Sequence, residues 1–221
     1  MSSEINIIGE SGLQFFGKIS ASISHEINNV LAIINENAGL LDDFTIMADK
    51  GMPIDPKRLK SVASTILAQI RRADEIVRNM NSFSHTIDQS KTELNLRETV
   101  EVVVALSHRF ASMRGITIEV KPSENIVTIT TAAFFLENLI WLCLDFAMNV
   151  TGSAKTISLT IRETDLGGRI RFAGLEGLTA ELADSFLSDR ETALLGMLKA
   201  ELTVSAGEKE LILYLPKLLD I

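Results

Sequence analysis

The chain has 221 residues, of which 46% are hydrophobic and 23% charged, and its 21 basic and 29 acidic side chains give a net charge of −8. This composition excludes a disordered chain and argues against non-specific nucleic-acid binding, which requires a basic surface. Cys143 is the only cysteine, so no disulfide or cysteine metal site forms within one chain. No uninterrupted apolar run reaches the roughly 18 residues of a membrane span, and the N-terminus lacks a secretory leader. We expect a cytoplasmic protein that binds neither nucleic acid nor membrane.

The first half of the chain has the pattern of two long amphipathic helices. Apolar residues recur every three or four positions over residues 12–48 and again over 59–83. Between them lie helix-breaking residues, and Asp55 followed by Pro56 is a typical helix start. Two such helices joined by a short loop predict an antiparallel hairpin. Because one hairpin leaves part of each apolar stripe uncovered, we expect a four-helix bundle formed by a homodimer.

The second half of the chain mixes helices with short strands. Helices are expected over residues 96–114 and 132–149, with one or two more over 178–200. Alternating patterns predict strands over residues 116–120, 126–130, 156–161, 169–172, 201–205 and 210–215. Mostly antiparallel strands in this mixture indicate an α+β sandwich whose helices cover one face of the sheet. The expected domains are residues 1–90 and 91–221.

A polar motif, His25-Glu26-Ile27-Asn28-Asn29, lies on the first predicted helix. His25 and Asn29 are four residues apart and therefore share a helix face. His25 lies two residues from the apolar Ile23 and Ile27, about 200° around the helix from each. The imidazole is therefore expected to face solvent or a partner. A His-Glu-x-x-His zinc site is excluded because Asn29 stands at the second histidine position.

The motif Ser24-His25-Glu26-Ile27-Asn28-Asn29 resembles the H-box of two-component sensor histidine kinases. Residues 76–83, IVRNMNSF, are similar to the end of the second helix in that family's phosphoacceptor hairpin. The order of elements after Leu94 is also similar to that of the family's ATP-binding domain. The resemblance implies a dimerising hairpin followed by a Bergerat-type α/β sandwich. Val30 replaces a proline that is common in the family, so we expect a smaller helix bend below the histidine.

The second domain departs from the family in three parts of the nucleotide site. Trp141 and Asp145 stand roughly where the family has its magnesium-binding asparagines. The adenine-binding aspartate is absent from residues 172–177, and no glycine-rich loop lies between Gly177 and Leu195. Such glycines let backbone N–H groups approach phosphate oxygens. We therefore expect a degenerate ATPase-like domain that binds no ATP and no other cofactor.

The resemblance assigns roles to the residues around His25. His25 becomes the phosphoacceptor, and Glu26 orients its imidazole or takes its proton. Asn29 would position a water if the chain retains phosphatase activity. A partner receiver domain of a response regulator would supply the aspartate and Mg²⁺. The expected contacts for docking this receiver are Lys18, Ser22, Ala32 and Glu36.

These observations predict a histidine phosphotransferase that passes a phosphoryl group between receiver aspartates through His25. Two alternatives stay open at this point. The chain could be an active histidine kinase with a divergent nucleotide site, or a non-catalytic adaptor that docks response regulators.

Overall fold

A computed structural model describes residues 2–123 and 125–219 of the chain. Contacts within the chain divide it into two compact units. Residues Ser20–Asn81 form a helical hairpin, and Met1–Ile19 together with Ser82–Ile221 form an α/β unit. The predicted fold class, long N-terminal helices followed by a mixed α/β sandwich, is confirmed.

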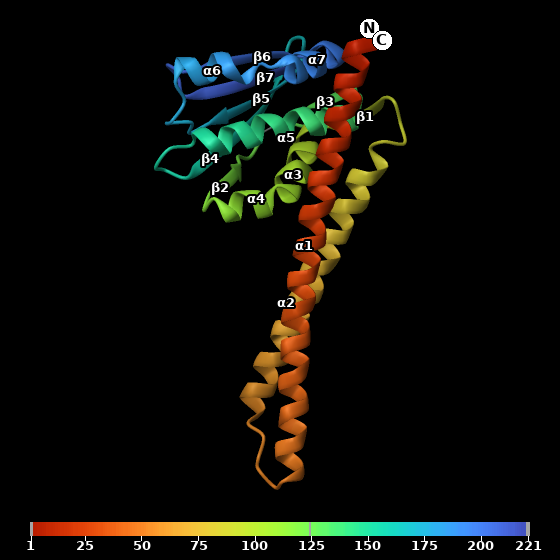
Figure 1. Ribbon diagram of the computed structural model, residues 1–221, viewed down its shortest axis with the longest axis vertical. Coiled ribbons are helices and arrows are strands. Elements are labelled where there is room, and N and C mark those ends of the chain that lie inside the picture. Colours follow the sequence, from red (N-terminus) through yellow and green to blue (C-terminus); the bar gives the residue numbers. More distant parts are fainter. Residues whose placement is uncertain (1, 124, 220–221) are drawn as a thin grey trace. The chain divides into compact units, whose positions relative to one another are not determined.

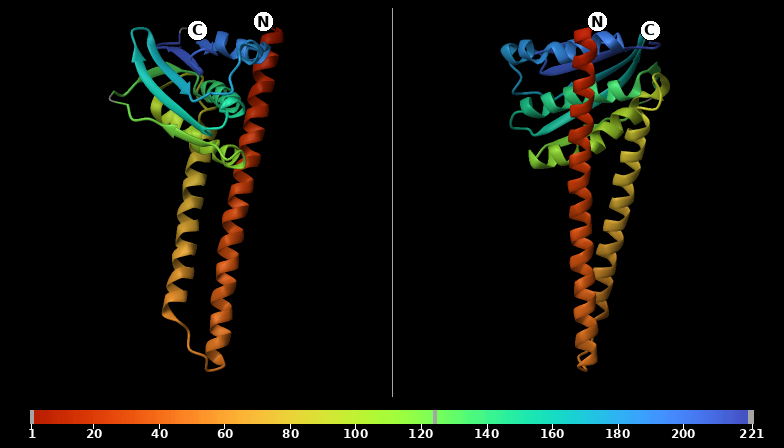
Figure 2. Two further views of the ribbon diagram at one scale, coloured as in Figure 1. Left: turned by 90° about the vertical axis from the view of Figure 1, so that its left-hand side faces the viewer. Right: turned by 45° about the vertical axis from the view of Figure 1, so that its right-hand side comes forward.

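The hairpin consists of the C-terminal part of α1 (Ser2–Asp49) and most of α2 (Pro56–His85), which lie side by side in both views of Figure 2. The predicted start of α2 is confirmed, because the Asp55 carboxylate accepts a hydrogen bond of 2.9 Å from the Lys57 N–H. Helix α1 begins ten residues earlier than the apolar periodicity indicated. In the α/β unit these added turns bury Ser11, and at Gly12, where the predicted helix began, a Cβ would lie 3.0 Å from the Phe134 ring.

The α/β unit contains a large sheet of five strands in the order β2-β4-β5-β7-β6. Its strands are β2 (Thr117–Val120), β4 (Thr156–Thr164), β5 (Gly167–Ala173), β7 (Glu210–Pro216) and β6 (Glu201–Ser205). Only the β2–β4 pair is parallel. A two-residue turn joins β4 to β5, and Gly167 follows it with a φ of +151° where a Cβ would lie 2.2 Å from the Leu215 carbonyl oxygen. This close approach requires glycine.

A small sheet pairs β1 (Thr92–Asn95) with β3 (Thr128–Thr131). Strand β1 was not predicted, because its four residues carry no alternating apolar pattern. Five helices complete the unit: α3 (Leu96–Leu106), α4 (His108–Met113), α5 (Ala133–Val150), α6 (Ala180–Phe186) and α7 (Asp189–Leu198). Helices α3, α5 and α7 cover one face of the large sheet in Figure 1.

The prediction of a single helix over residues 96–114 is wrong, because the helix is interrupted at Ser107. The Ser107 N–H is shared between the carbonyl oxygens of Val103 and Val104, at 2.9 and 3.1 Å. This tighter turn ends α3 at Leu106, and α4 begins at His108. Ser107 is fully buried at the break.

The core of the α/β unit lies between the large sheet and its helices. The inward residues of the central strands are buried: Ile157, Leu159, Ile161, Ile170, Phe172, Leu211, Leu213 and Leu215. An aromatic cluster joins three helices, with the Phe15 ring 5.2 Å from Phe83 and 5.6 Å from Trp141 between centroids. Among the described helices, α5 alone is long and apolar enough to cross a membrane, but 72% of it is buried within the fold. It has the burial of a core helix.

Candidate functional site

Helix α1 presents the motif residues on two different sides. His25 and Asn29 are exposed, as the sequence indicated, whereas Glu26 is buried. One residue along an α-helix turns the side chain by about 100°, which separates neighbouring residues in this way. The exposed His25 imidazole is therefore open to a partner and carries no hydrogen bond to a described side chain.

Glu26 has a partner that the sequence motif does not identify. The Arg72 guanidinium on α2 donates a hydrogen bond of 3.2 Å to the Glu26 carboxylate. The Glu26 side chain is 11% exposed and that of Arg72 43%, so the ion pair is half open to water. This contact links the two helices of the hairpin beside His25. The signal that could have suggested it is Arg71-Arg72, a pair of cations inside the second amphipathic helix.

The four expected docking residues differ in exposure and surroundings. Ala32 and Glu36 are exposed, and their positions seven and eleven residues after His25 place them on its helix face. Ser22 is buried, at 4% exposure. Lys18 belongs to the α/β unit, where its Nζ lies 4.8 Å from the centroid of the Trp141 ring. The exposed face at the motif therefore comprises His25, Asn29, Ala32 and Glu36.

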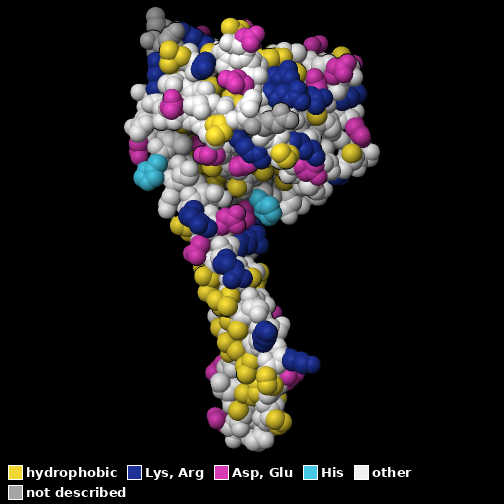
Figure 3. All heavy atoms as spheres, turned by 180° about the vertical axis from the view of Figure 1, so that it is seen from behind, with side chains coloured by type: hydrophobic (Ala, Val, Ile, Leu, Met, Phe, Trp, Pro, Cys, Tyr) yellow, Lys and Arg dark blue, Asp and Glu magenta, His cyan; other side chains and the backbone are white. Residues whose placement is uncertain are grey.

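Large apolar side chains remain exposed along the hairpin. Figure 3 shows apolar side chains running along its length. In the hairpin parts of α1 and α2 the exposed members are Leu31, Leu40, Ile46, Leu67, Ile70 and Val77, each between 39% and 54% exposed. A contiguous apolar surface of this kind is unusual on a monomer and is typical of an interface.

The α/β unit has a hollow of about 250 Å³ between α5 and the α6–α7 segment. Residues of α5 on this side are Leu142, Asp145, Phe146 and Asn149. The Phe146 ring stacks on Phe186 of α6, with centroids 4.2 Å apart and planes 23° from parallel. This aromatic pair lies across the hollow from α5 to α6. Neither phenylalanine was singled out by sequence reasoning, because helix periodicity does not indicate which residue of α6 meets α5.

Trp141 and Asp145 point to different surroundings. Trp141 is 3% exposed and packs in the aromatic cluster against Phe15 and Phe110. Asp145 accepts a hydrogen bond of 2.9 Å from the Arg114 guanidinium. Of the two positions expected to replace the magnesium asparagines, only Asp145 lines the hollow. Among residues 2–123 and 125–219, no group of three or more His, Cys, Asp or Glu side chains is placed to hold a metal ion.

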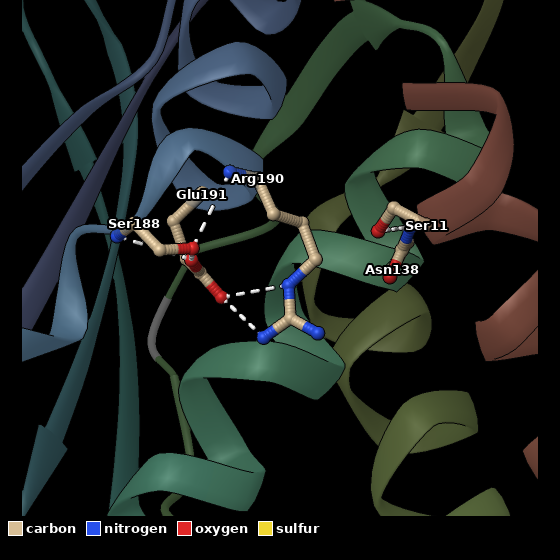
Figure 4. A network of polar contacts seen from close by, with 5 residues as sticks. All are labelled: Ser11, Asn138, Ser188, Arg190 and Glu191. Atoms are coloured by element: carbon tan, nitrogen blue, oxygen red, sulfur yellow. Dashed lines mark hydrogen bonds and ion pairs between the residues drawn. The ribbon is translucent and has the colours of Figure 1, made fainter. Parts of the chain in front are cut away.

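A network of polar contacts surrounds the first turn of α7 beside this hollow (Figure 4). Glu191 is 1% exposed and accepts hydrogen bonds from the Arg190 guanidinium at 2.6 and 2.9 Å. Its other carboxylate oxygen accepts the Ser188 hydroxyl and backbone N–H, which forms a capping box. Elsewhere in the same view, the Asn138 amide donates a hydrogen bond of 3.0 Å to the Ser11 hydroxyl. The segment after Gly177 therefore contains a helix, α7, whose start is capped.

Burial also changes the chemistry of Glu137 on α5. The residue is 3% exposed, and this desolvation raises the pKa of its carboxyl group from 4.5 to about 8. The Thr86 hydroxyl lies 3.1 Å from Glu137 Oε2 but only 2.6 Å from the Phe83 carbonyl oxygen. Because a hydroxyl has one hydrogen, Thr86 donates to Phe83, and the protonated Glu137 donates to Thr86. A neutral carboxylic acid satisfies this network.

No family model matches the chain, and no curated protein matches it. Among solved structures, the nucleotide-free catalytic domain of histidine kinase ThkA covers 60% of this chain and 100% of its own, at 15% identity and a TM-score of 0.51. Acinetobacter baumannii histidine kinase AdeS covers 87% of this chain and 98% of its own, at 12% identity and a TM-score of 0.47. ThkA in complex with the response regulator TrrA covers 93% of this chain and 63% of its own, at 20% identity and a TM-score of 0.47. The likeness to the ThkA catalytic domain establishes a histidine-kinase-like fold.

Proposed function

We propose that this chain is a histidine phosphotransferase, which carries a phosphoryl group between receiver-domain aspartates through His25. The observation that carries the proposal is the exposed His25 imidazole beside Asn29, in a chain that has a histidine-kinase-like fold. Receiver domains of response regulators are the partners in this proposal, and they supply Mg²⁺ as well as the aspartates.

The transfer needs few groups from this chain. A lone pair on one ring nitrogen of His25 attacks the phosphorus of an aspartyl phosphate, and the bond from phosphorus to the aspartate oxygen breaks. The electron pair of that bond returns to the receiver as a carboxylate, and the remaining ring proton leaves when the phosphohistidine becomes neutral. The reverse step delivers the group to a second receiver. Positioning and charge neutralisation supply most of the catalysis in phosphoryl transfer.

Glu26 and Asn29 assist this step in the proposal. Glu26 orients the imidazole or accepts its proton, while Arg72 holds the carboxylate on the hairpin. Asn29, one helical turn from His25 on the exposed face, positions a water if the phosphohistidine or a bound aspartyl phosphate is hydrolysed. Ala32 and Glu36 extend the same face for receiver docking, with Ala32 allowing a close approach.

We further propose that the α/β unit binds no ATP. The stacked rings of Phe146 and Phe186 support this, because they lie in the hollow between α5 and α6. Trp141 packs in the core and offers no oxygen ligand to a metal. The phosphoryl group must then come from another protein.

The proposed assembly is a cytoplasmic homodimer whose two hairpins form a four-helix bundle. The apolar residues exposed along α1 and α2 support it, because a second hairpin would remove them from water.

The test is transfer of labelled phosphate from phosphorylated receiver domains to the purified chain. Wild-type protein should acquire label that is lost in acid and retained in base, and His25→Ala should acquire none. His85→Ala is the matched control, because it removes another exposed histidine and should label like the wild type. A wild-type chain that never labels with any receiver contradicts the phosphotransferase and leaves the adaptor.

A calorimetric titration with ATP and Mg²⁺ separates the remaining alternative. We expect no heat of binding at a protein concentration high enough to detect a micromolar Kd for ATP. A micromolar Kd, followed by autophosphorylation of His25, would show that the chain is an active histidine kinase.

A further inference from the structure

Three arginines gather on the open face of the large sheet, opposite the helices. Arg162 lies on β4, and Arg169 and Arg171 lie on β5. Their neighbours Ile161, Ile170 and Phe172 are buried on the helix-covered face, so strand alternation places the arginines on the other face. With Thr160 they line a hollow of about 220 Å³. Lys and Arg side chains also gather on the α/β unit in the view of Figure 3.

The register brings these positive charges close together. Arg162 is directly opposite Arg169 across the β4–β5 pair, and Arg171 is opposite Thr160. Side chains directly opposite in an antiparallel pair have Cβ atoms about 5 Å apart, and like charges at this spacing destabilise the sheet. The paired arginines bring no stability to the sheet, since Thr or Val at these exposed strand positions would suit it equally well.

Among the described residues, only one of these three positive charges has an acidic partner. Arg171 forms an ion pair with Glu210 on β7, whereas Arg162 and Arg169 form no hydrogen bond or ion pair with any described side chain. This holds in a chain whose net charge is −8 and whose acidic side chains outnumber its basic ones by 29 to 21. The unpaired cations therefore match an anionic group that comes from outside the chain.

We propose that this arginine face, defined by Thr160, Arg162, Arg169 and Arg171, is a docking surface for an acidic surface of a partner protein. Arginine forms bidentate hydrogen bonds with carboxylates, and it is enriched at protein interfaces. Tyr214 and Ile212 of β7 lie next to Arg169 and Arg171 in register and are half-buried on the same face. They add the aromatic and apolar contact that is typical of the centre of an interface.

The expected binding strengths favour a protein over a free small anion as the partner. An exposed charge pair strengthens binding by about fivefold or less, so the two unpaired arginines hold a free anion with a Kd on the order of tens of mM. A protein surface adds apolar contact and several carboxylates at once. Extended polyanions such as nucleic acid are opposed by the net charge of −8. Docking at the arginine face requires no phosphoryl transfer at His25.

The test uses a fluorescent polyglutamate peptide as a probe, with binding followed by anisotropy and by backbone amide shifts in NMR. The peptide should shift amides of β4 and β5, and rising salt should weaken its binding. The triple variant Arg162→Gln/Arg169→Gln/Arg171→Gln should lose about tenfold or more in affinity. The triple variant to lysine keeps the charge and should lose less, because lysine forms no bidentate pair.

A matched control removes three exposed cations from the hairpin instead, with Lys57→Gln/Lys60→Gln/Arg78→Gln. Both triple variants change the net charge from −8 to −11, so a general charge effect would weaken them equally. The hairpin variant should retain the wild-type affinity. The proposal is overturned if the two glutamine variants bind alike or if the amide shifts lie outside β4 and β5. Tighter binding of inorganic phosphate, or of a single-stranded oligonucleotide, than of polyglutamate would overturn it as well.

Discussion

Glu137→Gln should abolish a large pH dependence of stability. The carboxyl pKa is 4.5 when exposed and about 8 in the fold, because burial disfavours the charged form. Between these two values the folded state keeps a proton that the unfolded state has released. The free energy of unfolding of the wild type therefore falls as the pH rises through this window, by about 1.4 kcal/mol per pH unit. The full window corresponds to a loss of about 5 kcal/mol.

Glutamine is the suitable replacement because it copies the protonated acid. Its amide N–H can donate to Thr86 Oγ1 as the carboxylic O–H does, and Thr86 still donates to the Phe83 carbonyl oxygen. Wild type and Glu137→Gln should therefore have similar stability near pH 5, where the buried acid is neutral. Near pH 9 the variant should be more stable by a few kcal/mol, up to the limit of about 5.

Urea unfolding followed by far-UV circular dichroism at both pH values measures this difference. Glu75→Gln is the matched control, because Glu75 is an exposed glutamate on α2, and its stability should follow the wild type at both pH values. A stability difference between wild type and Glu137→Gln that stays constant from acidic to alkaline pH would refute the argument. It would mean that the carboxylate remains charged and satisfied in the fold.

Three further predictions concern the hairpin, the hollow and the sheet. Asn29→Ala should still accept phosphate from a receiver but should slow any loss of label as inorganic phosphate, measured by a time course of the labelled protein. Phe186→Ala should lower the free energy of unfolding by about 3 kcal/mol in urea, because Phe186 is 8% exposed and stacks on Phe146; Leu187→Ala, at an exposed neighbour, should change it little. Arg169→Thr should raise the free energy of unfolding by about 0.2–1 kcal/mol, because it removes a cation directly opposite Arg162. A fall in stability on this last substitution would show that the arginine pair is stabilising.

The order of elements followed from local patterns in the sequence. The three-and-four spacing of apolar residues identified both long helices, and alternation identified the strands that became β2, β4, β5, β6 and β7. Asp55-Pro56 marked the start of α2 correctly. These signals are local because helix and strand periodicities repeat within a few residues. The break at Ser107 and the strand β1 escaped this reasoning, since each depends on pairing or packing with distant segments.

The sequence by itself determined the fold class, the main helices and strands, and the helix that exposes His25 and Asn29. Only the tertiary structure decided that Glu26 meets Arg72, that Phe146 stacks on Phe186 and that Arg162 faces Arg169. Periodicity fixes which side of an element a residue lies on, but a partner 7 to 46 positions away in sequence is chosen by how elements pack. The same limit explains Ser22, which shares the polar spacing of the motif and is nevertheless buried.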